Sequence, residues 1–119
     1  MKHNQSLEDY LESILTLSAE NQVVHRIDVA KKMSVSGAAV NKAVKILLQK
    51  DFVYEDGKHL YLTKNGKAYA EAVYERHCVI REFLTALGVS GDCAQQDACK
   101  MEHLVSEETF SAMKKFLEK

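Results

Sequence analysis

The sequence predicts a mainly α-helical protein with one small β-hairpin. Apolar residues recur at helical spacing over most of the chain, and no proline interrupts that spacing. One stretch differs, because the apolar and aromatic triplets 52–54 and 60–62 flank Asp56-Gly57, a dipeptide that favours tight hairpin turns. The composition, with 46% hydrophobic and 28% charged residues among 119, is that of an ordinary folded chain rather than a disordered one.

The first half of the chain predicts three helices followed by the hairpin. We expect these helices over 7–19, 27–33 and 37–50. Ser34-Val35-Ser36 predicts a turn before the third helix, with Ser36 as its N-cap. Two helices joined by a tight turn, of which the second is amphipathic and basic, are typical of a helix-turn-helix motif. The hairpin that follows occupies the place of a wing.

The second half of the chain predicts three more helices, over 64–87, 92–105 and 107–117. Thr63 and Ser106 stand where N-caps are expected, and Gly88 ends the long helix. The apolar sides of these helices exceed what so small a unit needs to cover itself, so we expect a homodimer interface. Packing of the last apolar stripe within the chain is the alternative. We place the domain boundary between residues 1–66 and 67–119.

Charge is distributed unevenly along the chain. The net charge is −1, but residues 26–67 hold nine Lys/Arg against four Asp/Glu, while the remainder holds seven against thirteen. A basic middle segment that coincides with the helix-turn-helix and the hairpin predicts contact with double-stranded DNA. A solvated lysine-rich surface is the alternative for the charge alone.

Metal-capable side chains are concentrated near the C-terminus. In a helix, Cys99, Glu102 and His103 stand at i, i+3 and i+4 and share one face. The first helix adds two acidic residues on one side, and the long helix adds a histidine among apolar residues. A solvated polar face and a hydrogen-bonded core histidine are the alternatives. The candidate ligands of a divalent metal ion are Asp9, Glu12, His77, Cys99, Glu102 and His103.

Six spaced segments carry a family resemblance, and they occur in order over nearly the whole chain. They are Ser6-x-Glu8-x-Tyr10-Leu11, Asp28-Val29-Ala30, Val35-Ser36, Leu62-Thr63-x-x-Gly66, Arg76-His77 and Asp97-Ala98-Cys99-Lys100-Met101-Glu102-His103-x-x-Ser106. Together they resemble the diphtheria toxin repressor and manganese transport regulator family. The resemblance implies a winged helix-turn-helix domain, a helical metal-binding and dimerisation domain, and metal-activated repression of metal-homeostasis genes on palindromic operator DNA.

The expected metal is Mn(II) or Fe(II), and the thiolate also admits Co(II) or Zn(II). Relative to the family this chain is mixed, because Asp9 and Glu12 match the manganese branch while Cys99 matches the iron branch. Arg81 stands one turn after His77, where both branches tend to have glutamate. This departure argues against a second metal site that relies on that acid. The resemblance is to the short, two-domain form of the family.

For DNA recognition, the resemblance places the base contacts at the start of the helix over 37–50. Asn41 is expected to read a base edge, Ala38 and Ala39 to contact thymine methyl groups, and Lys42 to reach guanine or phosphate. Phosphate contacts are expected from the basic residues outside that helix. The candidate DNA contacts are Arg26, Ser36, Ala38, Ala39, Asn41, Lys42, Lys58 and His59.

Other functional classes are less compatible with the sequence. There is no signal-like N-terminus, no apolar run of membrane-span length and no disulfide framework, so we expect a cytoplasmic protein without a membrane partner. We expect neither an enzyme nor a small-molecule substrate. Two alternatives stay open: a winged-helix regulator that responds to a non-metal signal, and a small hydrolase whose metal-bound water is the nucleophile.

Overall fold

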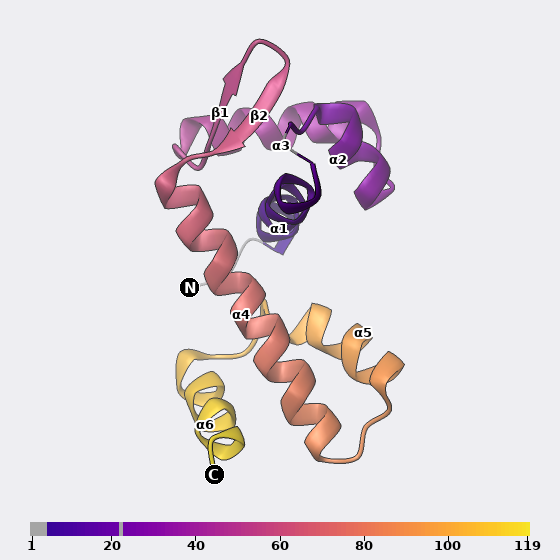
Figure 1. The fold of residues 1–119 in the computed structure, drawn as a ribbon, viewed down its shortest axis with the longest axis vertical. Helices are drawn as coiled ribbons and strands as arrows, with labels where there is room; N and C mark the ends of the chain where they lie inside the picture. Colours follow the sequence, from indigo (N-terminus) through magenta and orange to yellow (C-terminus); the bar gives the residue numbers. More distant parts are fainter. Residues whose placement is uncertain (1–4, 22) are drawn as a thin grey trace. The chain divides into compact units, whose positions relative to one another are not determined.

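The computed structural model describes residues 5–21 and 23–119, apart from the side chains of residues 5 and 6. Its elements, in chain order, are α1 (Gln5–Glu20), α2 (Arg26–Met33), α3 (Gly37–Gln49), β1 (Val53–Asp56), β2 (His59–Leu62), α4 (Lys64–Ala86), α5 (Gly91–Met101) and α6 (Glu107–Leu117) (Figure 1). The chain forms two compact units, here called the N-terminal unit (Gln5–Glu71) and the C-terminal unit (Ala72–Lys119). The predicted mainly helical fold with one hairpin is confirmed.

The N-terminal unit packs α1, α2, α3 and the hairpin around one apolar core. On α3, the buried residues Val40, Ala43, Val44 and Leu47 follow the i, i+3, i+4, i+7 spacing of an amphipathic helix. The same core contains Leu60 of β2, whose backbone N–H donates to the Val24 carbonyl at 2.8 Å. Burial of one face of α3 therefore leaves its opposite face exposed to solvent.

The helix-turn-helix has the predicted local signals. Ser34 ends α2 in the left-handed conformation with φ of 56°. Ser36 precedes α3, and its side-chain oxygen accepts a hydrogen bond from the Ala39 backbone N–H at 3.1 Å. This bond satisfies one of the N–H groups that a helix start leaves unpaired.

The hairpin turn lies one residue later than predicted. The antiparallel register runs from Val53↔Leu62 to Asp56↔His59, so Asp56 belongs to β1 and the turn consists of Gly57 and Lys58. Gly57 has φ of +64°, a left-handed conformation that glycine adopts without strain. Asp56 pairs with His59 across the strands, so the predicted Asp56-Gly57 turn is wrong by one residue.

The junction between the hairpin and α4 is tightly packed. Thr63 Oγ1 accepts a hydrogen bond from the Gly66 backbone N–H at 2.9 Å, as the predicted N-cap. It also donates to the Asp51 carbonyl at 2.6 Å. A Cβ on Gly66 would lie 1.8 Å from the Phe52 carbonyl oxygen, so only glycine fits at this close approach.

The C-terminal unit packs the second part of α4, α5 and α6 around Ile80, Ala98 and Met113. The predicted apolar stripe of α6 divides, because Phe110 and Met113 are buried whereas Phe116 is 52% exposed. Ser106 caps α6 as predicted, accepting a hydrogen bond from the Thr109 backbone N–H at 3.2 Å. Packing within the chain therefore uses part of the stripe and leaves Phe116 accessible.

The helix predicted over 92–105 is shorter in the structure. Its N-cap is Ser90, and α5 ends at Met101, so Glu102 is the C-cap and His103 lies in the turn that follows. Across the described residues, none of the helices combines the length and apolar character that a membrane span requires.

Candidate functional site

The exposed face of α3 carries the residues predicted to contact bases. Ser36, Ala38, Asn41 and Lys42 are exposed and Ala39 is half-buried. Because the core uses the other face of the helix, small side chains, an amide and an ammonium group are presented to solvent along one surface. This surface has the composition expected of a recognition helix that enters the major groove of DNA.

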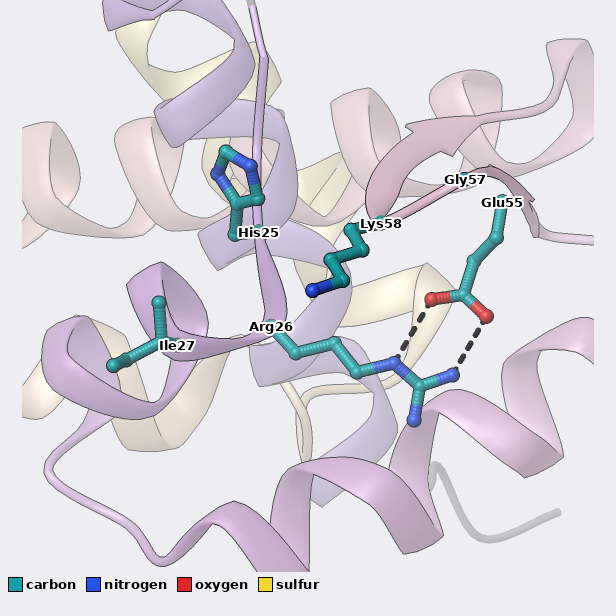
Figure 2. Close-up of a pocket in the computed structure, with 6 residues that line it drawn as sticks. All are labelled: His25, Arg26, Ile27, Glu55, Gly57 and Lys58. Atoms are coloured by element: carbon teal, nitrogen blue, oxygen red, sulfur yellow. Dashed lines mark hydrogen bonds and ion pairs between the residues drawn. The ribbon is translucent and has the colours of Figure 1, made fainter.

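Arg26, at the start of α2, is hydrogen-bonded to residues of β1 and α3, and Figure 2 draws the pair with Glu55 of β1. Its guanidinium donates to both carboxylate oxygens of Glu55, from Nε to Oε2 at 2.9 Å and from Nη2 to Oε1 at 2.6 Å. A third donor, Nη1, reaches Asn41 Oδ1 at 2.8 Å. The hydrogen bonds from Arg26, aided by its charge, lower the pKa of Glu55, and the same hydrogen bonds raise the pKa of Arg26. The pair is therefore ionised at neutral pH.

The network borders a hollow of about 320 Å³ between the start of α2 and the hairpin turn (Figure 2). Arg26 and Lys58 line it, and both are predicted phosphate contacts. His59 lies beside it, half-buried, with its ring edge-on to His25 at 4.9 Å between centroids. The structure thus places the three predicted phosphate contacts in and around the hairpin turn.

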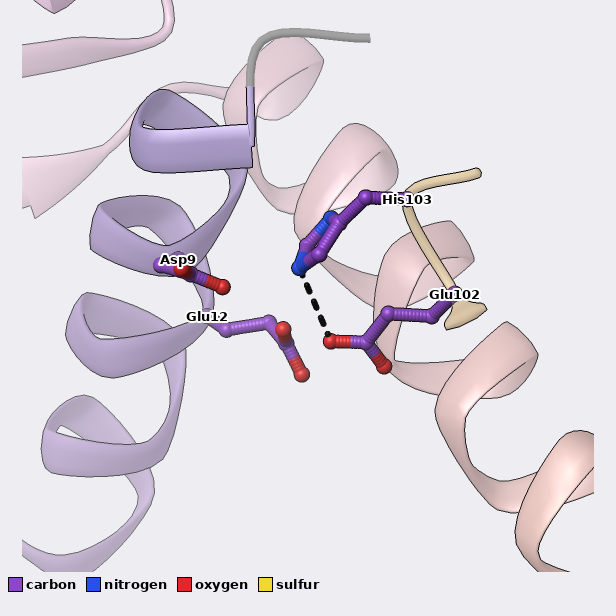
Figure 3. Close-up of side chains that lie close together, drawn as sticks. All are labelled: Asp9, Glu12, Glu102 and His103. Atoms are coloured by element: carbon purple, nitrogen blue, oxygen red, sulfur yellow. Dashed lines mark ion pairs between the residues drawn. The ribbon is translucent and has the colours of Figure 1, made fainter. Parts of the chain in front are cut away.

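Asp9 and Glu12, the predicted ligands of the N-terminal unit, project from the same side of α1 and are half-buried (Figure 3). The adjacent Glu8 was not a predicted site residue, yet its side chain is only 2% exposed. Tyr69 donates its hydroxyl hydrogen to Glu8 Oε2 at 2.5 Å. Burial, followed by this hydrogen bond to Glu8, raises the pKa of Tyr69 to about 12. The contact gives Glu8 a structural role.

The four predicted ligands of the C-terminal unit lie together, and we call them the ligand cluster: His77, Cys99, Glu102 and His103. Glu102 is central, with Oε2 at 3.1 Å from His77 Nδ1 and Oε1 at 3.3 Å from His103 Nε2 (Figure 3 draws the second pair). Cys99 Sγ is 3.8 Å from His77 Nδ1. Glu102, His103 and His77 are buried, whereas Cys99 is exposed.

The backbone of the ligand cluster differs from the expectation. The prediction placed Cys99, Glu102 and His103 on one face of a continuous helix. In the structure Cys99 is on the last turn of α5, while Glu102 and His103 follow the end of the helix. The turn, rather than helical spacing alone, brings both Glu102 and His103 into the buried cluster.

A hydrogen-bond chain that the sequence did not reveal orients His77. His77 Nε2 lies 3.1 Å from Gln95 Oε1, and Arg81 Nη1 donates to the same oxygen at 3.4 Å. Because a carbonyl oxygen only accepts hydrogen bonds, His77 Nε2 is the donor in this contact. Nδ1 faces Glu102 Oε2 at 3.1 Å and Cys99 Sγ at 3.8 Å. Such outer hydrogen bonds commonly orient histidine ligands.

The ligand cluster fits a divalent transition metal. Among the described residues, Glu102 Oε2 is a buried carboxylate oxygen with no hydrogen-bond partner. A buried carboxylate is costly unless a cation or hydrogen bonds compensate its charge. Carboxylate, imidazole and thiolate donors in one cluster suit divalent ions from Mn(II) to Zn(II). The donor set therefore has both the charge and the chemistry of a cation site.

Comparisons with known proteins agree with both halves of this description. Residues 3–60 match the family description "Iron dependent repressor, N-terminal DNA binding domain". Residues 63–119 match "Iron dependent repressor, metal binding and dimerisation domain". The transcriptional regulator MntR of Escherichia coli is 36% identical over 114 residues, which are 95% of this chain and 74% of that protein. An uncharacterised helix-turn-helix regulator of Methanocaldococcus jannaschii is 34% identical over 98% of this chain and 95% of its own length.

Solved structures show the same similarity. The manganese regulator SloR has a TM-score of 0.83 and 37% identity, over 99% of this chain and 55% of that chain. A manganese-dependent transcriptional repressor in complex with manganese has a TM-score of 0.85 and 26% identity, over 94% of this chain and 52% of that one. The chain thus spans about half the length of these solved relatives.

Proposed function

The chain belongs to the iron-dependent repressor family, and from that premise we propose that it is a metal-dependent repressor of transcription. It binds palindromic operator DNA as a homodimer when loaded with Mn(II) or Fe(II), and it controls genes of metal homeostasis. The observation that carries this proposal is the buried Glu102 carboxylate, which lies between two imidazoles and has one oxygen without a hydrogen bond among the described residues.

The proposed DNA contacts come from α3 and the hairpin turn. Asn41 and Lys42 are exposed on the face of α3 that the core does not use, which supports base contacts. Lys58 and His59 lie where a wing meets the phosphate backbone, which supports sequence-independent contacts. Neither set of contacts needs a catalytic group, so we propose that the protein binds DNA without acting as an enzyme. We propose the cytoplasm as its location.

The proposed metal ligands are those of the ligand cluster together with Asp9 and Glu12. A divalent ion would add positive charge beside the buried Glu102 carboxylate. The ligand candidates come from both family domains, so a metal ion held by both sets would link the DNA-binding domain to the dimerisation domain. Two of the similar structures are named as manganese regulators, which favours Mn(II), while the exposed Cys99 thiol also admits Fe(II), Co(II) or Zn(II).

Accessible apolar residues of the C-terminal unit support the homodimer. Leu87, Leu104 and Phe116 are 60%, 77% and 52% exposed. Exposed large apolar side chains in a domain of the dimerisation type are suited to an interface between two copies. A two-fold dimer predicts a palindromic operator.

The test begins with DNA selected from a randomised library by the metal-loaded protein. Fluorescence anisotropy then measures the Kd for the selected DNA with Mn(II), Fe(II), Co(II) or Zn(II), against a chelator control. We expect binding at least about 100-fold tighter with the activating metal, and a dimer by sedimentation. Tight binding that ignores the chelator would refute metal control and favour a winged-helix regulator with another signal.

A further inference from the structure

We propose that Arg26 is a positioning residue that sets the base preference of Asn41, and that Glu55 of the hairpin holds Arg26 for this task. The inference rests on the proposed DNA-binding function and adds a specificity determinant to it. Asn41 then approaches DNA with its amide N–H donors foremost, and its oxygen is turned towards the guanidinium.

The geometry joins three elements of the N-terminal unit. Arg26 starts α2, Glu55 belongs to β1 and Asn41 lies on α3. The guanidinium group of Arg26 is fixed by two hydrogen bonds to Glu55, at 2.9 and 2.6 Å, which is the bidentate geometry preferred by arginine and carboxylate. Its remaining Nη1 is thereby aimed at Asn41 Oδ1, at 2.8 Å. Without the Glu55 carboxylate the Arg26 guanidinium would no longer be held in place, and it would no longer fix the orientation of the Asn41 amide.

The chemical consequence concerns which base edge Asn41 matches. An unconstrained asparagine pairs with adenine through one donor and one acceptor, to N7 and N6–H₂ respectively. Here Oδ1 faces a charged donor, so the amide plane is fixed with Nδ2 on the opposite side. Two N–H donors match an edge that presents acceptors, as guanine does with O6 and N7. The network therefore favours guanine over adenine at the base that Asn41 contacts.

The same network makes Arg26 a poor phosphate contact. Three of its five N–H donors are used by Glu55 and Asn41, and its charge is paired with the Glu55 carboxylate. A phosphate would have to compete with that carboxylate for the same guanidinium N–H donors. Lys58, which extends into the same hollow, is the matched residue with a predicted phosphate role (Figure 2).

The experiment compares Arg26→Met, Glu55→Gln and Lys58→Met in the metal-loaded full chain, with circular dichroism as the check on folding. The contacted base is the one at which Asn41→Ala loses discrimination. Anisotropy then gives the Kd for guanine and adenine at that base, and the slope of log Kd against log salt concentration. We expect Arg26→Met and Glu55→Gln to shift the preference about tenfold towards adenine with the salt slope unchanged. Lys58→Met should weaken both sequences equally and reduce the slope by about one.

A double variant tests whether Arg26 acts on the base preference through Asn41. In an Asn41→Ala background, Arg26→Met should no longer change the base preference. The inference is overturned if Arg26→Met weakens all sequences equally and lowers the salt slope, which would make Arg26 a phosphate contact. It is also overturned if the preference does not move. Failure of the wild-type protein to bind DNA with any metal would instead refute the proposed function, and this inference with it.

Discussion

Two buried carboxylates, one in each unit, differ in how their charge is compensated. Glu8 and Glu102 are both 2% exposed. Glu8 accepts a 2.5 Å hydrogen bond from the Tyr69 hydroxyl, whereas Glu102 Oε2 has no hydrogen bond among the described residues and lies beside His77. A buried carboxylate that accepts a hydrogen bond stabilises the fold, while a buried carboxylate oxygen without one costs stability. The comparison supports a structural role for Glu8 and the proposed ligand role of Glu102.

The largest expected effect is that of Glu102→Gln. The variant keeps the shape of the side chain but removes the charge, so we expect metal affinity to fall by at least about 100-fold in calorimetric titration with Mn(II) or Co(II). Metal-free protein should unfold at an equal or higher temperature, because a buried charge has been removed. Glu108→Gln, at an exposed position of the same unit, is the control and should change neither quantity. A variant that loses stability but keeps metal affinity would assign Glu102 a structural role.

Tyr69→Phe tests the other buried carboxylate, Glu8. We expect this variant to lower stability, whereas Glu102→Gln should keep or raise it. It removes a hydrogen bond to a charged buried group, so we expect a loss of about 1.5 kcal/mol in the free energy of unfolding by urea. Tyr54→Phe, at an exposed tyrosine, is the control and should leave that free energy unchanged. An equal loss in both variants would contradict a specific role for the Tyr69 to Glu8 contact.

The same contact predicts a pH dependence at the alkaline end. The pKa of Tyr69 is raised from 10.0 to about 12 in the folded protein, so folding favours the protonated hydroxyl. Its contribution to stability is fully present below pH 10.0 and is lost as pH rises towards about 12. Absorbance at tyrosinate wavelengths should show one tyrosine that titrates near pH 12 in the wild type and is missing from Tyr69→Phe. Identical titration curves would refute the shift.

The smallest expected effect is on metal preference. Cys99→Glu replaces a soft thiolate with a hard carboxylate beside His77, so we expect the ratio of Mn(II) to Zn(II) affinity to rise about tenfold. Cys93→Glu adds the same charge at another exposed position of α5 and should leave the ratio near that of the wild type. A similar rise in both variants would mean that added charge alone, rather than coordination, changes the preference.

Local signals account for the parts of the fold that were predicted correctly. The N-caps Ser36, Thr63 and Ser106 act on backbone groups three residues away, so the sequence around each one is sufficient to identify it. The hairpin turn was predicted one residue too early, because Asp56 pairs with His59 across the strands and local turn signals do not reveal that pairing. The end of α5 was wrong by four residues, and Glu102 and His103, which follow it, are buried.

The sequence by itself determined the mainly helical fold with its hairpin, the amphipathic face of α3 and the candidate ligands, because helical periodicity and caps are local properties. Tertiary structure alone decided which polar groups meet. Glu55 lies 29 positions from Arg26, and Tyr69 lies 61 positions from Glu8. No periodicity relates such distant positions; the packing of the apolar core brings them together and thereby determines which charges are compensated.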